Sequence, residues 1–556
     1  MPSVLSRLAT AAEGSAAVTF VGSAAGDAGT DRVEWARLRD DALAMATVLQ
    51  ARGVAPGTHV GVLGPTTRPL VTAIEAIWLA GATVVTLPLP MRLGSIEAFA
   101  EQTRQRIIHA DAALVLVDPD LAPFLPSVPG DTFTQLDLGD LGRLTRTRQS
   151  ARYERPDEDP ERLAILQFTS GSTAEPKGVM LPDRCVVENI DAIIEAAAIG
   201  PSDRAVSWLP LYHDMGLIGL LMTPMLNGFE LVLGAPQDFL SAPACWPEWI
   251  SEFRGTITAG PNFSYALAAR ALRRAGVGSL DLSSWRLALN GAEPVDPSAV
   301  EAFCSSAAPH GLDAKSAFPV FGMAEATLAV TFPEPGLGIA VDTVDRAALE
   351  HDAYAAPAST SDDGHRRLAL LGRALRGFDL RIVDADTGRP LGEREVGELE
   401  LRGPSVTPGY YRNEAATANA FRDDWLRTGD LAYLVDGQLV VCGRLKDMII
   451  VGGRNVFPED IERAAASVEG VRAGNVIAFS SERRKRREAI VVVAEMKTDD
   501  PAALRDIVAT TVCDAVGVPP VEIVLVRPGS LPKTSSGKLQ RSLCRQRYVD
   551  DQLESV

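Results

Sequence analysis

Apolar and polar positions alternate with two different periods along the first 370 or so residues. Residues 60–63, 83–87 and 113–117 are short apolar runs that predict buried strands. Between and beside them, residues 68–80 and 96–109 place apolar side chains at helical spacing. Such alternation is typical of parallel sheets covered by helices. Sheets of this kind bind ligands at the carboxyl ends of their strands, so a site is expected there.

The pattern changes after Ala369. Residues 380–383, 397–402 and 438–442 are closely spaced strand candidates separated by turn residues. They predict a β-rich subdomain over about residues 370–444, at the end of a large α/β domain formed by residues 1–444.

A last block, residues 445–556, predicts a small mobile α+β domain. It contains helical patterns at 458–467 and 502–515 and a strand pattern at 488–495. Residues 333–367, by contrast, show no clear helical or strand period, and we expect an irregular segment there. The tail after Tyr548 is also expected to be irregular.

Composition limits the classes of function. A chain of 556 residues is too long for one core, and its net charge of -18 argues against sequence-independent binding of nucleic acid. Its six cysteines are scattered without a CxxC pair, which predicts reduced thiols in a cytoplasmic protein. Neither a signal peptide nor a simple transmembrane helix is expected.

Lysine is rare in this chain. The sequence holds 47 arginines and 7 lysines, so arginine is accepted wherever a general positive charge suffices. A lysine here is therefore more informative than usual, because its compact ammonium group differs chemically from a guanidinium.

A small-residue loop follows the predicted strand 163–168 and ends at Lys177, between Pro176 and Gly178. Small residues let successive N–H groups converge on an anion, and hydroxyls add donors. A flexible Ser/Gly loop is the alternative. The phosphate-binding candidates are Thr169, Ser170, Gly171, Ser172, Thr173 and Lys177.

Five further motifs follow in order, beginning at Asn290, Phe321, Arg427, Gly443 and Pro532. They read NGAEP, FGMAE, RTGD, GRLKD and PKTSSGK. Together with the loop they resemble the superfamily of acyl- and aryl-CoA synthetases, nonribosomal-peptide adenylation domains and beetle luciferases. The resemblance covers nearly the whole chain and implies an enzyme that forms an acyl adenylate from ATP, with Mg²⁺ as cofactor.

The resemblance assigns roles to individual residues. Phe321 offers a flat face to adenine, and Glu325 offers a hard oxygen ligand to Mg²⁺. Asp430 and Arg444 can bond the ribose, while Lys538 reaches the carboxylate and the α-phosphate. Further ATP-binding candidates in these motifs are Asn290, Gly291, Ala292, Glu293, Gly322, Met323 and Ala324.

Three segments resemble the fatty-acyl-AMP ligases in particular, which pass their acyl group to carrier proteins rather than to coenzyme A. The first, WLPLYHDMGL, contains His213, Asp214 and Met215, and the second, AGPNFSY, contains Asn262 and Phe263. The third, GRNVFP, spans residues 453–458. By resemblance His213 lines the path between ATP and the acid, although a structural His–Asp pair is the alternative. The other four residues are candidates for the acyl pocket.

The choice of acyl acceptor is less determined. Residues 325 and 372 are 47 positions apart, which is compatible with the insertion that restrains the C-terminal domain in fatty-acyl-AMP ligases, but also with a long loop. A long-chain fatty acyl-CoA synthetase and an aryl- or amino-acid-activating protein remain alternatives. Lys446 is the expected hinge of domain rotation. The basic run 483–487 is either a dock for an acidic acyl carrier protein or a solvated turn.

Overall fold

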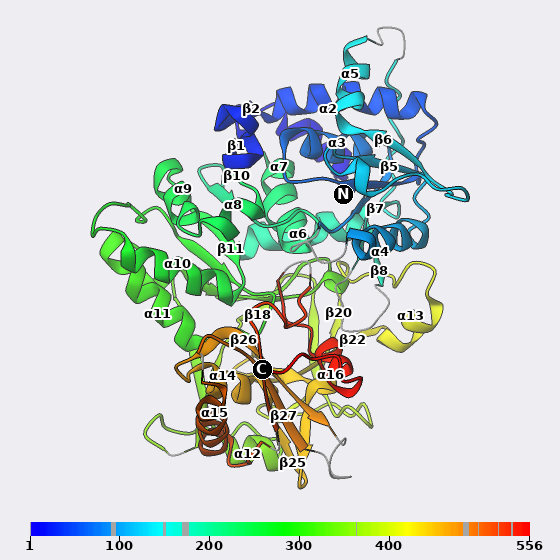
Figure 1. Cartoon of the computed structure of the whole chain (residues 1–556). Coiled ribbons are helices and arrows are strands. Elements are labelled where there is room, and N and C mark those ends of the chain that lie inside the picture. The colour runs from blue at the N-terminus through cyan, green and yellow to red at the C-terminus, as the bar shows by residue number, and fades with distance from the viewer. Residues whose placement is uncertain are drawn as a thin grey trace.

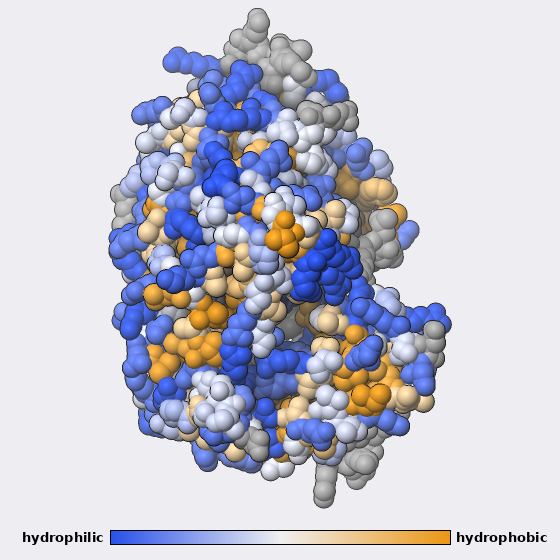
Figure 2. Space-filling view, turned by 90° about the vertical axis from the view of Figure 1, so that its left-hand side faces the viewer, coloured by the Kyte–Doolittle hydropathy of each residue, from blue (hydrophilic) through white to orange (hydrophobic). Residues whose placement is uncertain are grey.

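The computed structural model describes residues 2–89, 96–147, 152–168, 177–362, 364–481, 489–498, 500–520, 522–534 and 537–556. Helix-covered sheets occupy one end of the molecule, and the C-terminal block lies at the other end (Figure 1). No helix in these ranges is both long and apolar enough to cross a bilayer. On the face shown in Figure 2, hydrophilic side chains predominate and apolar residues form separate patches.

Two mostly parallel sheets form the larger part of the chain, which confirms the predicted α/β class. The seven-stranded sheet has the order β13-β12-β11-β9-β10-β1-β2, with only β1 and β2 antiparallel. Its strands are β1 (Ala17–Val21), β2 (Thr30–Glu34), β9 (Arg204–Ser207), β10 (Glu230–Leu233), β11 (Ile257–Gly260), β12 (Leu287–Asn290) and β13 (Ala317–Pro319).

The second sheet has six strands in the order β6-β5-β3-β4-β7-β8, and only β7 and β8 are antiparallel. Short apolar runs form its inner strands, as the sequence predicts, because side chains on both faces are buried. The strands are β3 (His59–Leu63), β4 (Thr83–Thr86), β5 (Leu114–Val117), β6 (Thr134–Asp137), β7 (Leu163–Phe168) and β8 (Gly178–Pro182).

Helices cover these sheets, and α3 (Arg68–Leu79) and α4 (Ile96–His109) lie where the periodicity predicts them. The other helices of this part are α1 (Val4–Ala11), α2 (Trp35–Ala51), α5 (Leu138–Thr147), α6 (Asp183–Ala196), α7 (Thr223–Asn227), α8 (Pro236–Ser241), α9 (Cys245–Phe253), α10 (Asn262–Arg274) and α11 (Pro297–Ala307). A π-helix, Met215–Met222, follows the His213-Asp214 pair directly.

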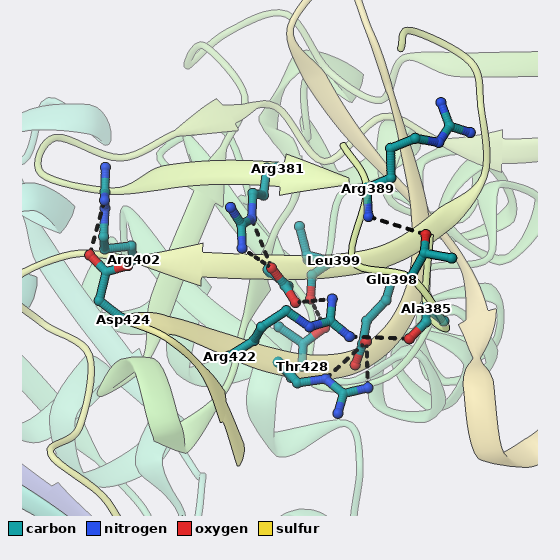
Figure 3. A network of polar contacts seen from close by, with 12 residues as sticks. Arg381, Ala385, Arg389, Glu398, Leu399, Arg402, Arg422, Asp424 and Thr428 are labelled. Carbon is teal, nitrogen blue, oxygen red and sulfur yellow. Dashed lines mark hydrogen bonds and ion pairs between the residues drawn. The ribbon is translucent and has the colours of Figure 1, made fainter. Parts of the chain in front are cut away.

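The predicted β-rich region forms a five-stranded antiparallel sheet, in which β23 pairs with β22. Its elements are β19 (Asp379–Val383), β20 (Gly397–Arg402), α13 (Glu414–Ala420), β21 (Phe421–Arg422), β22 (Trp425–Val435) and β23 (Gln438–Arg444). Figure 3 shows a polar network on this sheet. On β20 of this sheet, the fully buried Glu400 pairs with Arg381 and Arg422, at 2.6 and 2.8 Å.

The described residues between 449 and 525 include a hydrophobic core of their own. Their elements and the helix that follows are β24 (Ile449–Val451), β25 (Arg454–Val456), α14 (Pro458–Ala466), β26 (Val471–Ser481), β27 (Ala489–Met496), α15 (Pro501–Val516), β28 (Glu522–Val526) and α16 (Arg541–Val549). The order β26-β27-β28 combines an antiparallel and a parallel pair, as expected for an α+β block.

The expectation of an irregular segment over residues 333–367 is wrong. It contains strand β16 (Val341–Asp345), helix α12 (Arg346–His351) and the start of β17 (His365–Ala369), and β16 and β17 form an antiparallel pair. The sequence hides this because the two strands are short and partly exposed, so their apolar content is low. Two short strands nearby, β15 (Ala329–Phe332) and β18 (Arg373–Ala374), pair with each other.

Candidate active site

A large cleft runs between the two parallel sheets, the β-rich sheet and the C-terminal block. It begins where β7, β11, β12 and β13 end, at the edge where a site is expected. Predicted residues that line it are Lys177, His213, Asp214, Met215, Asn262, Phe263, Ala292, Glu293, Phe321, Gly322, Met323, Ala324, Glu325, Asp430, Arg444, Lys446 and Lys538.

Some predicted residues do not line this cleft. The buried Asn290 instead donates from Nδ2 to Oδ1 of Asn262 at 2.9 Å, and a Cβ at Gly291 would lie 2.8 Å from Val320. Both therefore shape the wall behind the cleft. Thr169, Ser170, Gly171, Ser172 and Thr173 lie outside the described residues, so their predicted phosphate contacts stay predictions.

The lysines of the chain gather in the cleft. Of seven lysines in the sequence, five line it: Lys177, Lys446, Lys497, Lys533 and Lys538. This is a concentration of positive charge in a protein whose net charge is -18. Acidic residues such as Glu325 and Asp430 also line the cleft, but lysines and arginines outnumber them. An excess of positive charge in a cleft attracts ligands of the opposite sign, here a polyanion.

Asp430 and Arg444 face each other on neighbouring strands, β22 and β23. Arg444 Nε lies 2.9 Å from Asp430 Oδ1, and the N–H of Asp430 donates to Thr428 Oγ1 at 3.0 Å. Burial raises the pKa of Asp430, and Arg444 counteracts the rise. The pair thus presents a carboxylate acceptor and a guanidinium donor at one spot, which suits two vicinal hydroxyl groups.

Glu325 lies on a loop between β14 (Phe321–Gly322) and β15. Its Oε1 accepts a hydrogen bond from the hydroxyl of Tyr410 at 2.9 Å, and its backbone carbonyl accepts one from Thr407 N–H at 2.8 Å. Its Oε2 makes no hydrogen bond within the described ranges. Because Glu325 lines the cleft, its carboxylate suits Mg²⁺, which uses one or two carboxylates and completes its shell with phosphate oxygens and water.

His213 is bonded to its neighbour, Asp214, and also lines the cleft. The distance from Nδ1 to Asp214 Oδ1 is 2.5 Å, and Asp214 caps the π-helix by accepting Met215 N–H at 2.7 Å. Burial alone would raise the pKa of Asp214, but His213 and Lys538 outweigh it and hold the pKa below its ordinary value. The two interpretations of His213 are therefore compatible: a paired histidine that also borders the site.

Lys538 enters the cleft from the C-terminal block. Burial lowers the pKa of its ammonium group, while Asp214 and Glu293 oppose the shift. Glu293 Oε1 also accepts the N–H of Phe263 at 3.3 Å, at the start of α10, and a Cβ at the neighbouring Gly537 would lie 3.8 Å from the Phe263 ring. Lys538 thus lies on the side of the cleft where the acyl-pocket candidates lie.

Sequence analysis did not identify two residues that bond the predicted site residues or their neighbours. Tyr410 bonds Glu325, and Arg541 bonds Asp447, next to the predicted hinge Lys446, at 2.5 Å. The consecutive tyrosines 410 and 411 after a glycine were a signal, but nothing in the sequence pairs Tyr410 with residue 325. Arg541 had no signal beyond its place three residues after Lys538.

Comparison with known proteins identifies the family of the chain. The family model for AMP-binding enzymes matches residues 7–411. A structure from a study of fatty acyl-adenylate ligases from E. coli and L. pneumophila superposes with a TM-score of 0.91 at 32% identity, covering 99% of this chain and 98% of that one. The chain belongs to the AMP-binding enzyme family, the adenylate-forming ligases.

The relatives named for their reactions differ in the acyl acceptor. The medium-chain-fatty-acid–[acyl-carrier-protein] ligase JamA of Moorena producens is 35% identical over 73% of this chain and 71% of that protein. A Caulobacter vibrioides protein, provisionally assigned as an acyl-CoA synthetase, is 36% identical over 93% of this chain and 91% of that protein.

Proposed function

We propose that this chain activates a medium- or long-chain fatty acid with ATP, forming an acyl-AMP and releasing pyrophosphate. The observation that carries the proposal is the convergence of Glu325, Asp430 and Lys538 on one cleft from three distant parts of the chain. Each supplies a chemistry that the reaction needs: an oxygen ligand for a metal ion, an acceptor for ribose and a mobile positive charge.

The residues can support one balanced step. A carboxylate oxygen of the acid attacks the α-phosphorus of ATP, an O–P bond forms, and the bond to the bridging oxygen of pyrophosphate breaks. Lys538 stabilises the negative charge that develops on the carboxylate and the α-phosphate. Mg²⁺, held by Glu325 and phosphate oxygens, would neutralise charge on the leaving pyrophosphate.

Apolar side chains in the same cleft as Lys538 favour a fatty acid as substrate. Phe263 and Leu267 from α10 line the cleft together with Met215 and with Leu240 at the end of α8. In the described part of this wall, the acidic residues Asp214 and Glu293 already face Lys538, so neither is available as an anchor for an amino group. This disfavours the amino-acid-activating alternative.

The segment 333–367 supports an acyl carrier protein as the acceptor. It is bonded to the C-terminal block by Arg366, whose Nε lies 3.0 Å from Asp460, and by Glu350, which pairs with Arg454. The guanidinium of Arg346 also bonds the backbone carbonyl of Ala515. By resemblance, an insertion that restrains the C-terminal block is the mark of fatty-acyl-AMP ligases.

A fatty acyl-CoA synthetase is the second candidate, because a relative provisionally assigned to that activity covers most of the chain. One experiment separates the two. Purified protein receives ATP, Mg²⁺ and a panel of acids, and then either coenzyme A or a holo acyl carrier protein. We expect acyl-AMP to accumulate with fatty acids and to be consumed by the carrier. Rapid formation of acyl-CoA would favour the synthetase.

A further inference from the structure

Tyr410 lies on a segment, residues 405–411, that connects two loops of the predicted triphosphate site. The segment runs along the edge of β8, where Tyr411 N–H donates to the carbonyl of Gly178 at 2.8 Å and Met180 N–H donates to that of Gly409 at 3.1 Å. Tyr410 N–H donates to Thr417 Oγ1 at 3.0 Å. With 8% of its surface exposed, Tyr410 is fixed in position by its backbone and by its packing.

The phenol of Tyr410 orients one carboxylate. Its hydroxyl donates to Glu325 Oε1 at 2.9 Å, so the other carboxylate oxygen is directed elsewhere. The same segment also holds the backbone of Glu325 through Thr407 N–H. The position of this carboxylate is thus set by residues 405–411 and not by its own loop alone.

The loop of Glu325 is strained, and the same segment stabilises the strain. Thr327 has φ 72°, which is rare for a β-branched residue, and Leu328 N–H donates to the carbonyl of Ala326 across it in a γ-turn, at 2.9 Å. Thr327 is fully buried, and its hydroxyl donates to the carbonyl of Ser405 at 2.7 Å. Strain of this kind persists where the surrounding structure over-determines it, often at functional sites.

The ring of Tyr410 meets the other half of the site. Lys177, the last residue of the predicted phosphate loop, places its Nζ 4.8 Å from the centroid of the ring. An ammonium group over an aromatic face is attracted by the ring quadrupole. One side chain therefore contacts both a cation suited to phosphate and a carboxylate suited to Mg²⁺.

We propose that Tyr410 is a positioning residue for metal-bound ATP: its hydroxyl fixes Glu325 as a metal ligand and its ring fixes Lys177 against the phosphates. This inference rests on the proposed function, because it requires ATP to bind in this cleft. The two contacts of Tyr410 are chemically separable, so two substitutions test them separately.

The experiment measures binding of ATP to the full-length protein by titration calorimetry, once with excess Mg²⁺ and once with a chelator. Tyr410→Phe keeps the ring and removes the hydroxyl, so we expect binding with Mg²⁺ to weaken about tenfold, the size of a lost hydrogen bond to a charged group. Binding in chelator should not change. Tyr410→Leu removes both contacts and should weaken binding in both conditions.

The neighbouring Tyr411→Phe is the matched control, because Tyr411 packs against His59 outside the cleft, and we expect wild-type binding in both conditions. In a Glu325→Gln background, Tyr410→Phe should have no further effect on Mg²⁺-dependent binding. Equal weakening with and without Mg²⁺ in Tyr410→Phe, or no weakening at all, would overturn the inference. Wild-type protein that binds no ATP in either condition would instead overturn the proposed function.

Discussion

Arg366 offers the sharpest test of the restraint on the C-terminal block. Its side chain is 3% exposed, donates to the carbonyl of Cys442 at 3.0 Å, and stacks on Phe457 at 4.1 Å. Its ion pair with Asp460 joins the segment 333–367 to helix α14 across the predicted hinge. We expect Arg366→Met to loosen the block, because methionine can still pack on the ring but cannot pair with the carboxylate.

The expected loss of stability depends on which ion-pair partners Asp460 keeps in the variant. Removing one partner of a buried ion pair costs about 3–5 kcal/mol. Asp460 keeps Arg463 at 3.3 Å, so we take the lower end, about 3 kcal/mol. Two conformations are compared: the one in this structure, in which Asp460 is buried, and one in which the C-terminal block has rotated about the hinge. If rotation exposes Asp460 to water, the substitution destabilises only the conformation of this structure. The rotated population then rises roughly a hundredfold, at 1.36 kcal/mol per factor of ten.

The assay offers coenzyme A to Arg366→Met that already carries acyl-AMP, and we expect acyl-CoA to appear. Arg381→Met is the matched control; Figure 3 labels Arg381 and Arg422. Arg381 stacks on Trp425 at 4.1 Å and pairs with the buried Glu400, which would keep its ion pair with Arg422. All of these contacts lie within the β-rich sheet. Both variants should lose thermal stability, but only Arg366→Met should form acyl-CoA. Equal acyl-CoA formation by both, or none by either, would refute the restraint.

Three further predictions concern catalysis, the hinge and pH. Lys538→Ala should lower the rate of acyl-AMP formation by about 10²–10³ while ATP binding persists, because the substitution removes a positive charge needed in the transition state. The rate is measured by pyrophosphate release, and a normal rate would contradict the prediction. Lys446→Pro should spare adenylation but slow acyl transfer, as a rigid hinge cannot deliver the second conformation; equal loss in both half-reactions would disprove this. Burial raises the pKa of Glu75, on α3, to about 8 despite the nearby Arg39, whereas the unfolded chain releases that proton near 4.5. The free energy of unfolding should therefore fall as pH rises across this interval. Glu75→Gln should melt at a higher temperature than wild type at pH 9 but not at pH 5. Identical melting temperatures at pH 9 would contradict this prediction.

The sequence predicted the parallel sheets well because their strands are buried on both faces and read as apolar runs. Strand β7 has the predicted bounds for this reason, and helix α4 begins and ends where its helical spacing of apolar residues predicts. It missed α16, where only Cys544 and Tyr548 are buried among polar residues, so a helical period was hard to detect. It also missed the paired strands β16 and β17, which are partly exposed and whose Arg366 bonds a residue as distant in sequence as Asp460.

In the candidate site, too, local patterns could be predicted from the sequence and long-range contacts could not. Motifs identified many of the polar residues that line the cleft, because each motif carries its chemistry within a few positions. The partners that orient them are far away in sequence: Tyr410 lies 85 positions from Glu325, and Asp447 lies 94 positions from Arg541. Pairings at such separations depend on the complete fold, and no local pattern encodes them.

The most direct test of the central claim is fatty-acid-dependent exchange of labelled pyrophosphate into ATP, with the acyl-AMP identified by mass spectrometry. We predict exchange with medium- or long-chain acids and Mg²⁺, none without acid, and near-complete loss in Lys538→Ala. Absence of exchange with every fatty acid tested, or exchange that depends on an amino acid or aryl acid instead, would contradict the assignment.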